Sequence, residues 1–239
     1  MMMKLKTVRI KSFLTKLILL SVFGWIIPQL ALAQEMLNLS DENGKKTGLW
    51  KGFYQDGSLR YEGSFLNDRP QGIFRYYDES GRLKATNSFD HTGRKAWHRA
   101  FDSTGFLLAE GIYLNQKKDS VWTYYSAADS AVIAREAYQF DQKHGLSVTY
   151  YPQSGQPAEE LFYENGKLQG VWNKYFDVGT LMTSGFYEND KLNGPFTTYH
   201  PNGQVSISGQ YENDLQYGIW EFFDEDGNLI NTEKYKIRE

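Results

Sequence analysis

Residues 218–235 read GIWEFFDEDGNLINTEKY, and this stretch contains the pattern on which the fold depends. A short aromatic-rich segment comes first, then the dipeptide Asp226-Gly227, then a second short segment that ends at Tyr235. Aromatic segments are typical of strands, and Asp-Gly tolerates the positive φ that tight hairpin turns require. The stretch therefore predicts one β-hairpin.

The same pattern recurs along the chain. Its opening triplet is a Gly, an aliphatic residue or Pro, and an aromatic anchor; five copies are clear and three are weaker. The eight anchors stand at positions 50, 74, 97, 122, 147, 172, 196 and 220, with spacings of 23 to 25 residues. A near-constant period indicates a repeat array, whose units are numbered 1 to 8 by these anchors.

Other positions keep the same phase. An aromatic residue follows the anchor by three positions in seven of eight units, and a turn Gly follows it by seven or eight positions in seven units. Units 3 to 5 depart most, since Ala100 replaces the aromatic, Ser147 replaces the anchor, and Ser126 to Glu136 lacks the turn Gly. These departures indicate a local binding surface, a kink or drift.

The predicted fold is all-β: an elongated, twisted antiparallel sheet of about eight stacked β-hairpins. One hairpin is marginal in water, but stacking buries an aromatic ladder continuously. Sixteen strands at ~4.8 Å spacing would span on the order of 75 Å. Because the anchor and the aromatic three residues later have opposite strand parity, either a bulge separates them or both faces carry aromatics.

Residues 1–33 have the pattern of a secretory signal peptide. A basic stretch precedes the apolar run Leu17 to Leu32, and Ala31-Leu32-Ala33 fits a small-x-small cleavage site between Ala33 and Gln34. The alternative is an N-terminal membrane anchor, but the run is short for a spanning helix and Pro28 interrupts it. We expect an exported protein that is periplasmic, secreted or peripheral to the cell envelope, and not transmembrane after cleavage.

The remaining chain divides into a lead-in at residues 34–43 and the repeat array at 44–239. Residues 34–239 contain 21 Lys and Arg against 29 Asp and Glu, a net charge of −8. An acidic chain is unsuited to nucleic acid, whose phosphates need clustered basic residues. The absence of cysteine from the sequence excludes disulfides, thiolate metal sites and a cysteine nucleophile.

No catalytic, cofactor or metal motif is found in the sequence. The histidines (His91, His98, His144 and His200) fall at different phases of the repeat and are predicted to be solvated or to lie in turns. Asp224-Glu225-Asp226 is similar to the start of a calcium loop but lacks the remaining ligands. We therefore expect a protein without enzymatic activity, cofactor or metal.

The segment from Gly185 to Tyr199, GFYENDKLNGPFTTY, resembles a MORN-type repeat. It is most similar to the variant repeat of bacterial proteins labelled YwqK-family antitoxin components. The resemblance covers residues 44 to 239 and is strong in units 1, 2 and 6 to 8. It implies a β-hairpin solenoid without catalysis that acts as an interaction or membrane-associated scaffold.

The tryptophans of the array are the candidate binding residues: Trp50, Trp97, Trp122, Trp172 and Trp220. Periodic aromatics are what a stacked core needs, so burial is the first interpretation. The second is a row of exposed rings that grips sugar, choline or lipid headgroups.

Two functions follow from these observations. The first is an exported, non-enzymatic repeat scaffold that mediates protein–protein interaction in the cell envelope. The alternative is a binder of envelope glycan or membrane lipid headgroups through exposed aromatics. The net negative charge makes an anionic membrane an unattractive target.

Overall fold

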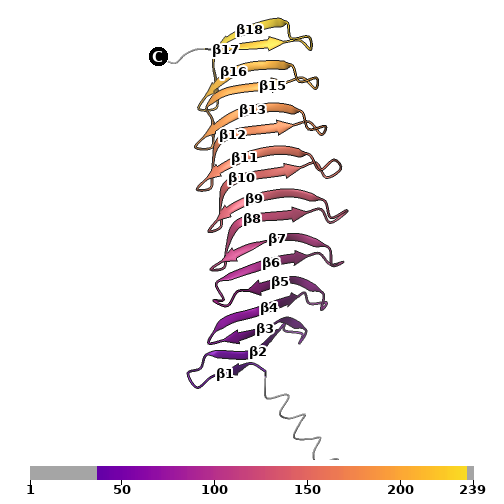
Figure 1. Ribbon diagram of the computed structural model, residues 1–239, viewed down its shortest axis with the longest axis vertical. Helices are drawn as coiled ribbons and strands as arrows, with labels where there is room; N and C mark the ends of the chain where they lie inside the picture. Colours follow the sequence, from indigo (N-terminus) through magenta and orange to yellow (C-terminus); the bar gives the residue numbers. More distant parts are fainter. Residues whose placement is uncertain (1–36, 236–239) are drawn as a thin grey trace, which may run out of the picture.

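The computed structural model describes residues 37–235 as one open sheet of 18 strands, with no helix in that range. The strands pair antiparallel in chain order, so the prediction of an all-β array is confirmed (Figure 1). Their bounds are β1 Leu39–Ser40, β2 Lys46–Phe53, β3 Leu59–Leu66, β4 Arg69–Tyr77, β5 Leu83–Phe89, β6 Lys95–Phe101, β7 Leu107–Leu114, β8 Lys117–Tyr125, β9 Val132–Gln139, β10 Gln142–Tyr150, β11 Pro157–Glu164, β12 Lys167–Tyr175, β13 Leu181–Glu188, β14 Lys191–Leu192, β15 Gly194–Tyr199, β16 Val205–Glu212, β17 Leu215–Phe223 and β18 Leu229–Tyr235.

These strands form eight hairpins, one for each predicted unit. The count exceeds sixteen because Asn193 divides one strand into β14 and β15, and because the lead-in adds β1. Leu39 and Ser40 pair with Thr47 and Lys46, so this part of the lead-in extends the sheet beyond β2. The proposed signal peptide and its cleavage site at Ala33 and Gln34 lie outside the described residues.

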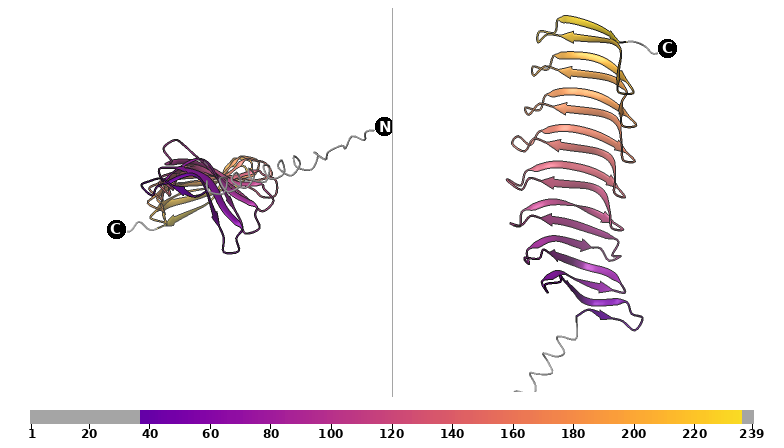
Figure 2. Two further views of the ribbon diagram at one scale, coloured as in Figure 1. Left: turned by 90° about the horizontal axis from the view of Figure 1, so that it is seen from below. Right: turned by 180° about the vertical axis from the view of Figure 1, so that it is seen from behind.

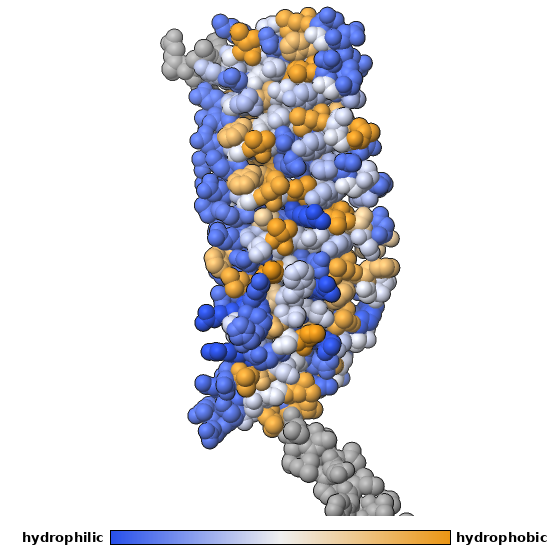
Figure 3. Space-filling view, viewed as in Figure 1, coloured by the Kyte–Doolittle hydropathy of each residue, from blue (hydrophilic) through white to orange (hydrophobic). Residues whose placement is uncertain are grey.

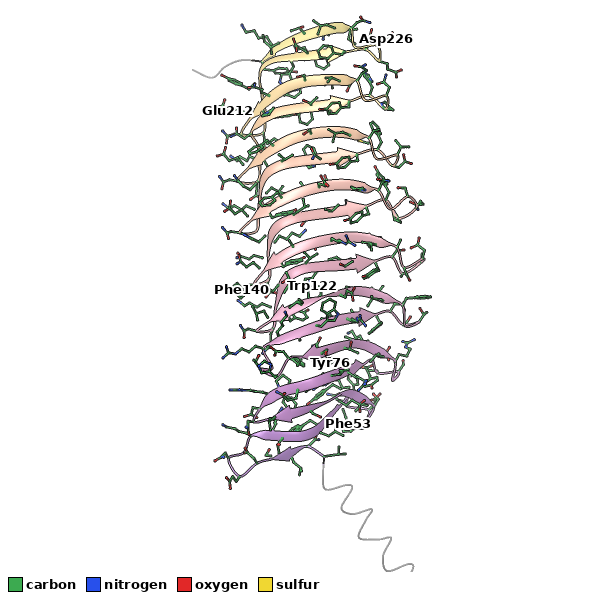
Figure 4. The ribbon with its side chains drawn as sticks, in the orientation of Figure 1. Phe53, Tyr76, Trp122, Phe140, Glu212 and Asp226 are labelled. Atoms are coloured by element: carbon green, nitrogen blue, oxygen red, sulfur yellow. The ribbon has the colours of Figure 1, made fainter. Side chains whose placement is uncertain are left out.

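The hairpins stack into a single-layer ribbon that twists along its length (Figures 1 and 2). The turns gather at two edges. Phe140 and Glu212 mark one edge, and Asp226 marks the other (Figure 4).

At the edge of Phe140, most turns have two residues, and positive φ occurs at both residues of turns such as Asn67-Asp68 and Asn213-Asp214, as type I′ turns require. These turns also join neighbouring units. In four places an Asp carboxylate accepts a hydrogen bond from a backbone N–H 22 or 23 residues earlier: Asp68 from Lys46, Asp141 from Lys118, Asp190 from Leu168 and Asp214 from Leu192.

The strand register explains the parity of the aromatic positions. Trp50 lies opposite Gly63 and Phe53 opposite Leu59, while Arg60 is the extra residue of a bulge. The bulge lies on the second strand, so the first strand alternates normally and both faces of the sheet carry aromatics. We call the face of Trp50 the inner face and the opposite face, which carries Leu49, the outer face.

Candidate interaction surfaces

The inner face carries a continuous row of stacked rings. Phe74, Trp122 and Trp220 are only 2–3% exposed, and Trp220 lies 5.1 Å from Tyr211 and 5.7 Å from Phe196 between ring centroids. A single-layer sheet has no second layer to cover this face. The rings bury one another instead, which gives each unit its share of the core.

Glycine on the neighbouring strand makes room for these rings. A Cβ placed on Gly209 would lie 2.3 Å from the Trp220 ring, and one on Gly63 would lie 2.4 Å from the Phe74 ring. Gly111 stands in the same relation to Trp122. The anchor ring therefore lies flat over backbone that has no side chain.

The five candidate tryptophans do not form one surface. Trp122 and Trp220 are buried, Trp50 and Trp172 are half-buried on the inner face, and Trp97 is 46% exposed on the outer face. Three of the inner indoles donate Nε1–H to a carbonyl or carboxylate: Trp50 to Leu39, Trp122 to Ile112 and Trp172 to Glu159. Whether any of them binds a ligand remains a prediction.

The assignment of Trp97 as the third anchor was wrong. His98 pairs with Asn87 and with Gly111, so it occupies the anchor row, and Trp97 points to the opposite face. The cause is the preceding turn. It runs from Asp90 to Arg94, whereas the other units have a two-residue turn, and β5 pairs with β6 without a register shift. With His98 as anchor, the spacing from Phe74 to Trp122 becomes regular.

His98 also departs from the prediction that the histidines are solvated or lie in turns. Its ring packs 5.2 Å from Tyr113 and 5.5 Å from Trp122, and Nδ1 lies 2.6 Å from Oδ1 of Asn87. Burial, with a smaller effect of the Lys118 charge, lowers the pKa of His98. The imidazole is thus a neutral member of the inner face, with Nδ1–H donating to Asn87.

Unit 5 replaces its anchor ring by a polar cluster. Ser147 stands in the anchor row opposite Glu136, whose carboxylate lies 2.8 Å from Nζ of Lys143 and 2.5 Å from the hydroxyl of Tyr138. The Tyr124 hydroxyl lies 3.5 Å from that of Tyr138. Glu136, Lys143 and Tyr138 satisfy one another, which accounts for a charged pair on this face, whereas the buried Ser147 hydroxyl has no hydrogen-bond partner within residues 37–235.

The outer face carries a row of apolar side chains that we call the outer ridge. Each member stands one residue before an anchor row position or lies opposite such a residue, and the large members are 36–58% exposed. The large members are Leu49, Ile73, Trp97, Val121, Leu146, Phe162, Val171, Phe186 and Ile219. Figure 3 shows apolar patches spread along the length of the viewed face, with hydrophilic residues along the turn edge at its left.

Beside the ridge runs a polar row fixed by repeated tyrosine–glutamate bonds. The hydroxyls of Tyr77, Tyr125 and Tyr175 donate to Glu62, Glu110 and Glu160 at 2.9, 2.8 and 2.6 Å. The bond from Tyr77 lowers the pKa of the Glu62 carboxyl, and burial together with the bond to Glu110 raises the pKa of Tyr125. These aromatics are therefore structural.

A groove opens on the inner face between units 2 and 3. It has a volume of about 510 Å³, and its walls include the rings of Phe65, Phe74, Tyr76, Phe89 and Tyr113, with Asn87 among them. A second hollow of about 350 Å³ shares Tyr76, Asn87 and Tyr113 with it and extends to His98. Tyr76 lies over the sheet, between the two turn edges (Figure 4).

Within residues 37–235, no three His, Asp or Glu side chains lie close enough to share a metal ion. No helix in the same range is long and apolar enough to cross a membrane. The Asp224 turn is held by its own hydrogen bonds to Asp226 and Asn228.

The fold and the repeated site together define a β-hairpin repeat protein in which each unit contacts its neighbours. The family model described as MORN repeat variant matches residues 46–67, 192–213 and 216–236, which correspond to units 1, 7 and 8. These three stretches of the chain are therefore similar to the MORN repeat variant, which supports a MORN-like repeat architecture. Proteins of this repeat family are generally non-enzymatic. No curated protein matches the sequence.

Solved structures give only partial likenesses. A mutant of S. aureus TarM in complex with fondaparinux, alpha-GlcNAc-glycerol and UDP is 15% identical over 41% of this chain and 19% of that chain, with a TM-score of 0.32. TarM itself is 14% identical over 40% and 20% of the two chains, with a TM-score of 0.30. A TcdB2-TccC3-Cdc42 structure is 10% identical over 76% and 15%, with a TM-score of 0.14. The chain spans at most a fifth of the length of each match.

Proposed function

We propose that the mature chain is an exported, non-enzymatic scaffold that binds a protein partner in the cell envelope through the outer ridge. The observation that carries the proposal is the ridge itself. Nine large apolar side chains lie in register on one face, and no other element of residues 37–235 packs over them. Exposed apolar side chains gathered in patches on one face are typical of protein–protein interaction sites.

Two substitutions on the ridge test this proposal. Val121→Glu with Val171→Glu places two charges on residues that are 53% and 55% exposed, so the fold should tolerate them while an apolar partner should not. Thr86→Glu with Ser184→Glu, on the polar row of the same face and with no acidic residue directly opposite, is the matched control. After cross-linking, the wild type and the control should capture the partner from envelope extracts, and the ridge variant should not. Equal capture by all three would refute the ridge as the docking surface.

Export is the second part of the proposal, and it is supported by the signal pattern of residues 1–33. Mass spectrometry of the protein recovered from its native host should give a chain that begins at Gln34. A full-length chain in the cytoplasm would contradict export.

We also propose that the repeats belong to the MORN variant labelled YwqK-family antitoxin component, on the basis of the segment from Gly185 to Tyr199. Antitoxin activity is not part of the proposal, because an exported chain would not meet a cytoplasmic toxin.

A second candidate function is binding of envelope glycan or lipid headgroups through aromatics. The observation that favours it is the ring-lined groove between units 2 and 3, which opens on the face opposite to the ridge.

A further inference from the structure

The groove lies beside unit 3, which departs from the repeat at two positions of the inner face. Its anchor is the smaller ring of His98, and Ala100 stands where unit 2 has Tyr76 and unit 4 has Tyr124. Each of these substitutions removes ring volume from the inner face. His98 lines the adjoining hollow, and Ala96 of the same strand lines the groove.

The turn edge of the sheet loses a hydrogen bond between neighbouring turns at the same place. In units 1, 4, 6 and 7 an Asp in the following turn bonds to the backbone N–H four residues before the anchor, as Asp68 bonds to Lys46. Unit 2 has Pro70 at that position, which has no N–H, and the longer turn of unit 3 brings Gly93 against the Pro70 ring instead. The carboxylate bond between turns is therefore absent at Pro70, although Asp68, which also lines the groove, makes one with Lys46.

Of the five groove rings, only Phe65 is paired with a cation among residues 37–235, since Nζ of Lys46 lies 5.0 Å from its ring centroid. Four residues before their anchors, Lys46 lies 4.5 Å from the Trp50 ring and Lys118 lies 4.5 Å from the Trp122 ring. Arg94 has this repeat position in unit 3, yet it lines the groove without a side-chain hydrogen bond or ion pair to any residue of 37–235. It stands at the mouth with its guanidinium donors available.

The groove wall includes one carboxylate, that of Asp68, which accepts the backbone N–H of Lys46 at 2.8 Å. The polar groups around Asn87 are neutral and directional. Asn87 accepts from His98 through Oδ1, and its Nδ2 lies 3.5 Å from the Tyr76 hydroxyl, a weak bond. One amide N–H of Asn87 is therefore free, and Nε2 of the neutral His98 is an acceptor. Burial raises the pKa of Tyr76, so its hydroxyl remains a donor.

From this set we infer that the groove binds a neutral oligosaccharide, with a pyranose ring against the aromatic walls. This inference rests on the second candidate function and specifies its site and ligand class. A pyranose presents C–H groups on a flat face, which pack on electron-rich rings, and hydroxyls at its rim, which need paired donors and acceptors. The two hollows, of about 510 and 350 Å³, accommodate more than one sugar unit. A lipid tail would leave Asn87 and Arg94 without partners, which disfavours it.

The experiment uses residues 34–239 and two probes, cellobiose and N,N′-diacetylchitobiose. Saturation-transfer NMR detects binding, and the side-chain amide signals of Asn87 in ¹⁵N spectra report the place. Asn87→Leu removes the amide at similar size, and Arg94→Ala removes the donor at the mouth. Gln216→Ala, at the repeat position of Arg94 in unit 8, is the matched control. An acetylated Tyr-Gly-Tyr peptide is run in parallel.

At least one sugar should bind saturably and shift the Asn87 amide signals. Asn87→Leu should weaken binding by about tenfold and Arg94→Ala by several-fold, with the control unchanged. Equal binding by all variants, binding of the peptide alone, or no binding of either sugar at millimolar concentration would overturn the inference. Arg94 is exposed, so its variant remains informative if Asn87→Leu does not fold.

The two proposals can fail separately. The ridge variant Val121→Glu with Val171→Glu should retain sugar binding, because the ridge lies on the other face. Asn87→Leu should retain capture of the protein partner for the same reason.

Discussion

Units 7 and 8 and units 3 and 5 solve the same packing problem with different residues. Beside the anchors of the last two units, a Cβ on Gly209 would lie 2.3 Å from the Trp220 ring and one on Gly185 would lie 3.5 Å from the Phe196 ring. In the middle, Asn87 stands under the smaller His98, and Glu136 stands under Ser147. The comparison teaches that the two positions change together, because the side chain on one strand occupies the space that the next anchor needs.

Unit 6 shows the limit of this rule. Leu161 stands opposite the large anchor Trp172 on one side, and the indole is only half-buried although a Cβ on Gly185, on the other side, would lie 2.9 Å from it. Its Nε1–H reaches the Glu159 carboxylate at 2.8 Å, whereas Nε1 of the fully covered Trp220 has no partner in the part of the chain described. A side chain beneath the ring thus costs burial and is offset by a hydrogen bond.

The largest effect should come from removing a buried anchor. Trp122→Ala should lower the free energy of unfolding by ~3–5 kcal/mol, since the ring is 2% exposed and is surrounded by Tyr113, His98 and Lys118. Trp97→Ala is the control, because this exposed ring should cost less than ~1 kcal/mol. Urea unfolding followed by circular dichroism measures both values. Similar losses for the two variants would refute the assignment of Trp97 to the outer face.

A smaller effect should come from filling the space under a ring. Gly209→Asn should cost ~1–3 kcal/mol, because even a Cβ would lie 2.3 Å from the Trp220 ring. Combining it with Trp220→His reproduces in unit 8 the Asn–His pair of unit 3. The double variant should lose less free energy of unfolding than the sum of the losses of the two single variants. Thermal unfolding of the four proteins gives the coupling energy. Strict additivity would show that the two positions do not share space.

The polar cluster of unit 5 should give a pH-dependent effect of about 1 kcal/mol, since Lys143 and Glu136 are both partly exposed. Burial alone would raise the pKa of Glu136, but the hydrogen bonds from Lys143 and Tyr138 outweigh it and hold the pKa below its ordinary value. A lowered carboxyl pKa stabilises the fold above pH ~4.3 and loses that contribution as pH falls through the folded-state pKa. The gap between wild type and Glu136→Gln should therefore close in acid.

At alkaline pH the cluster contributes a stability that is lost as the pH rises, the opposite direction to the loss in acid. Burial, followed by the bond to Glu136, raises the pKa of Tyr138 well above its usual range. A raised tyrosine pKa gives stability that is present below pH ~10 and is lost as pH rises further. Urea midpoints between pH 3 and pH 11 test both limbs, with Arg82→Gln, which removes an exposed ion pair in a turn, as the control. A gap between wild type and Glu136→Gln that does not vary with pH would contradict the role of the cluster.

The repeat architecture was readable from the sequence because every hairpin repeats the same strand and turn signals at 23 to 25 residue spacing. The residue of unit 3 that faces inward was not predictable from the sequence. Trp97 and His98 are adjacent, and only the turn length decides which of them lies on the inner face. The longer Asp90 to Arg94 turn was the available signal. The groove was also unpredictable, since its walls come from residues of units 1 to 3 whose spacing in the sequence does not set the volume between their rings.

The smallest effect should come from the hydrogen bonds that join neighbouring turns, in which an Asp carboxylate accepts a backbone N–H 22 or 23 residues earlier. These bonds are present at the regular end of the array and absent at Pro70, beside the groove. Asp214 accepts the backbone N–H of Leu192 at 2.8 Å, so Asp214→Ala should cost ~0.5–1.5 kcal/mol and speed hydrogen exchange at that amide. Asp226→Ala is the control, because that carboxylate accepts no hydrogen bond within residues 37–235. Hydrogen exchange should already be faster beside Pro70 in the wild type, since no carboxylate joins the turns there. Equal protection of the amides from hydrogen exchange along this edge would mean that the Asp-to-backbone hydrogen bonds do not set local stability. Unit 3 would then differ from its neighbours only in the volume of its rings.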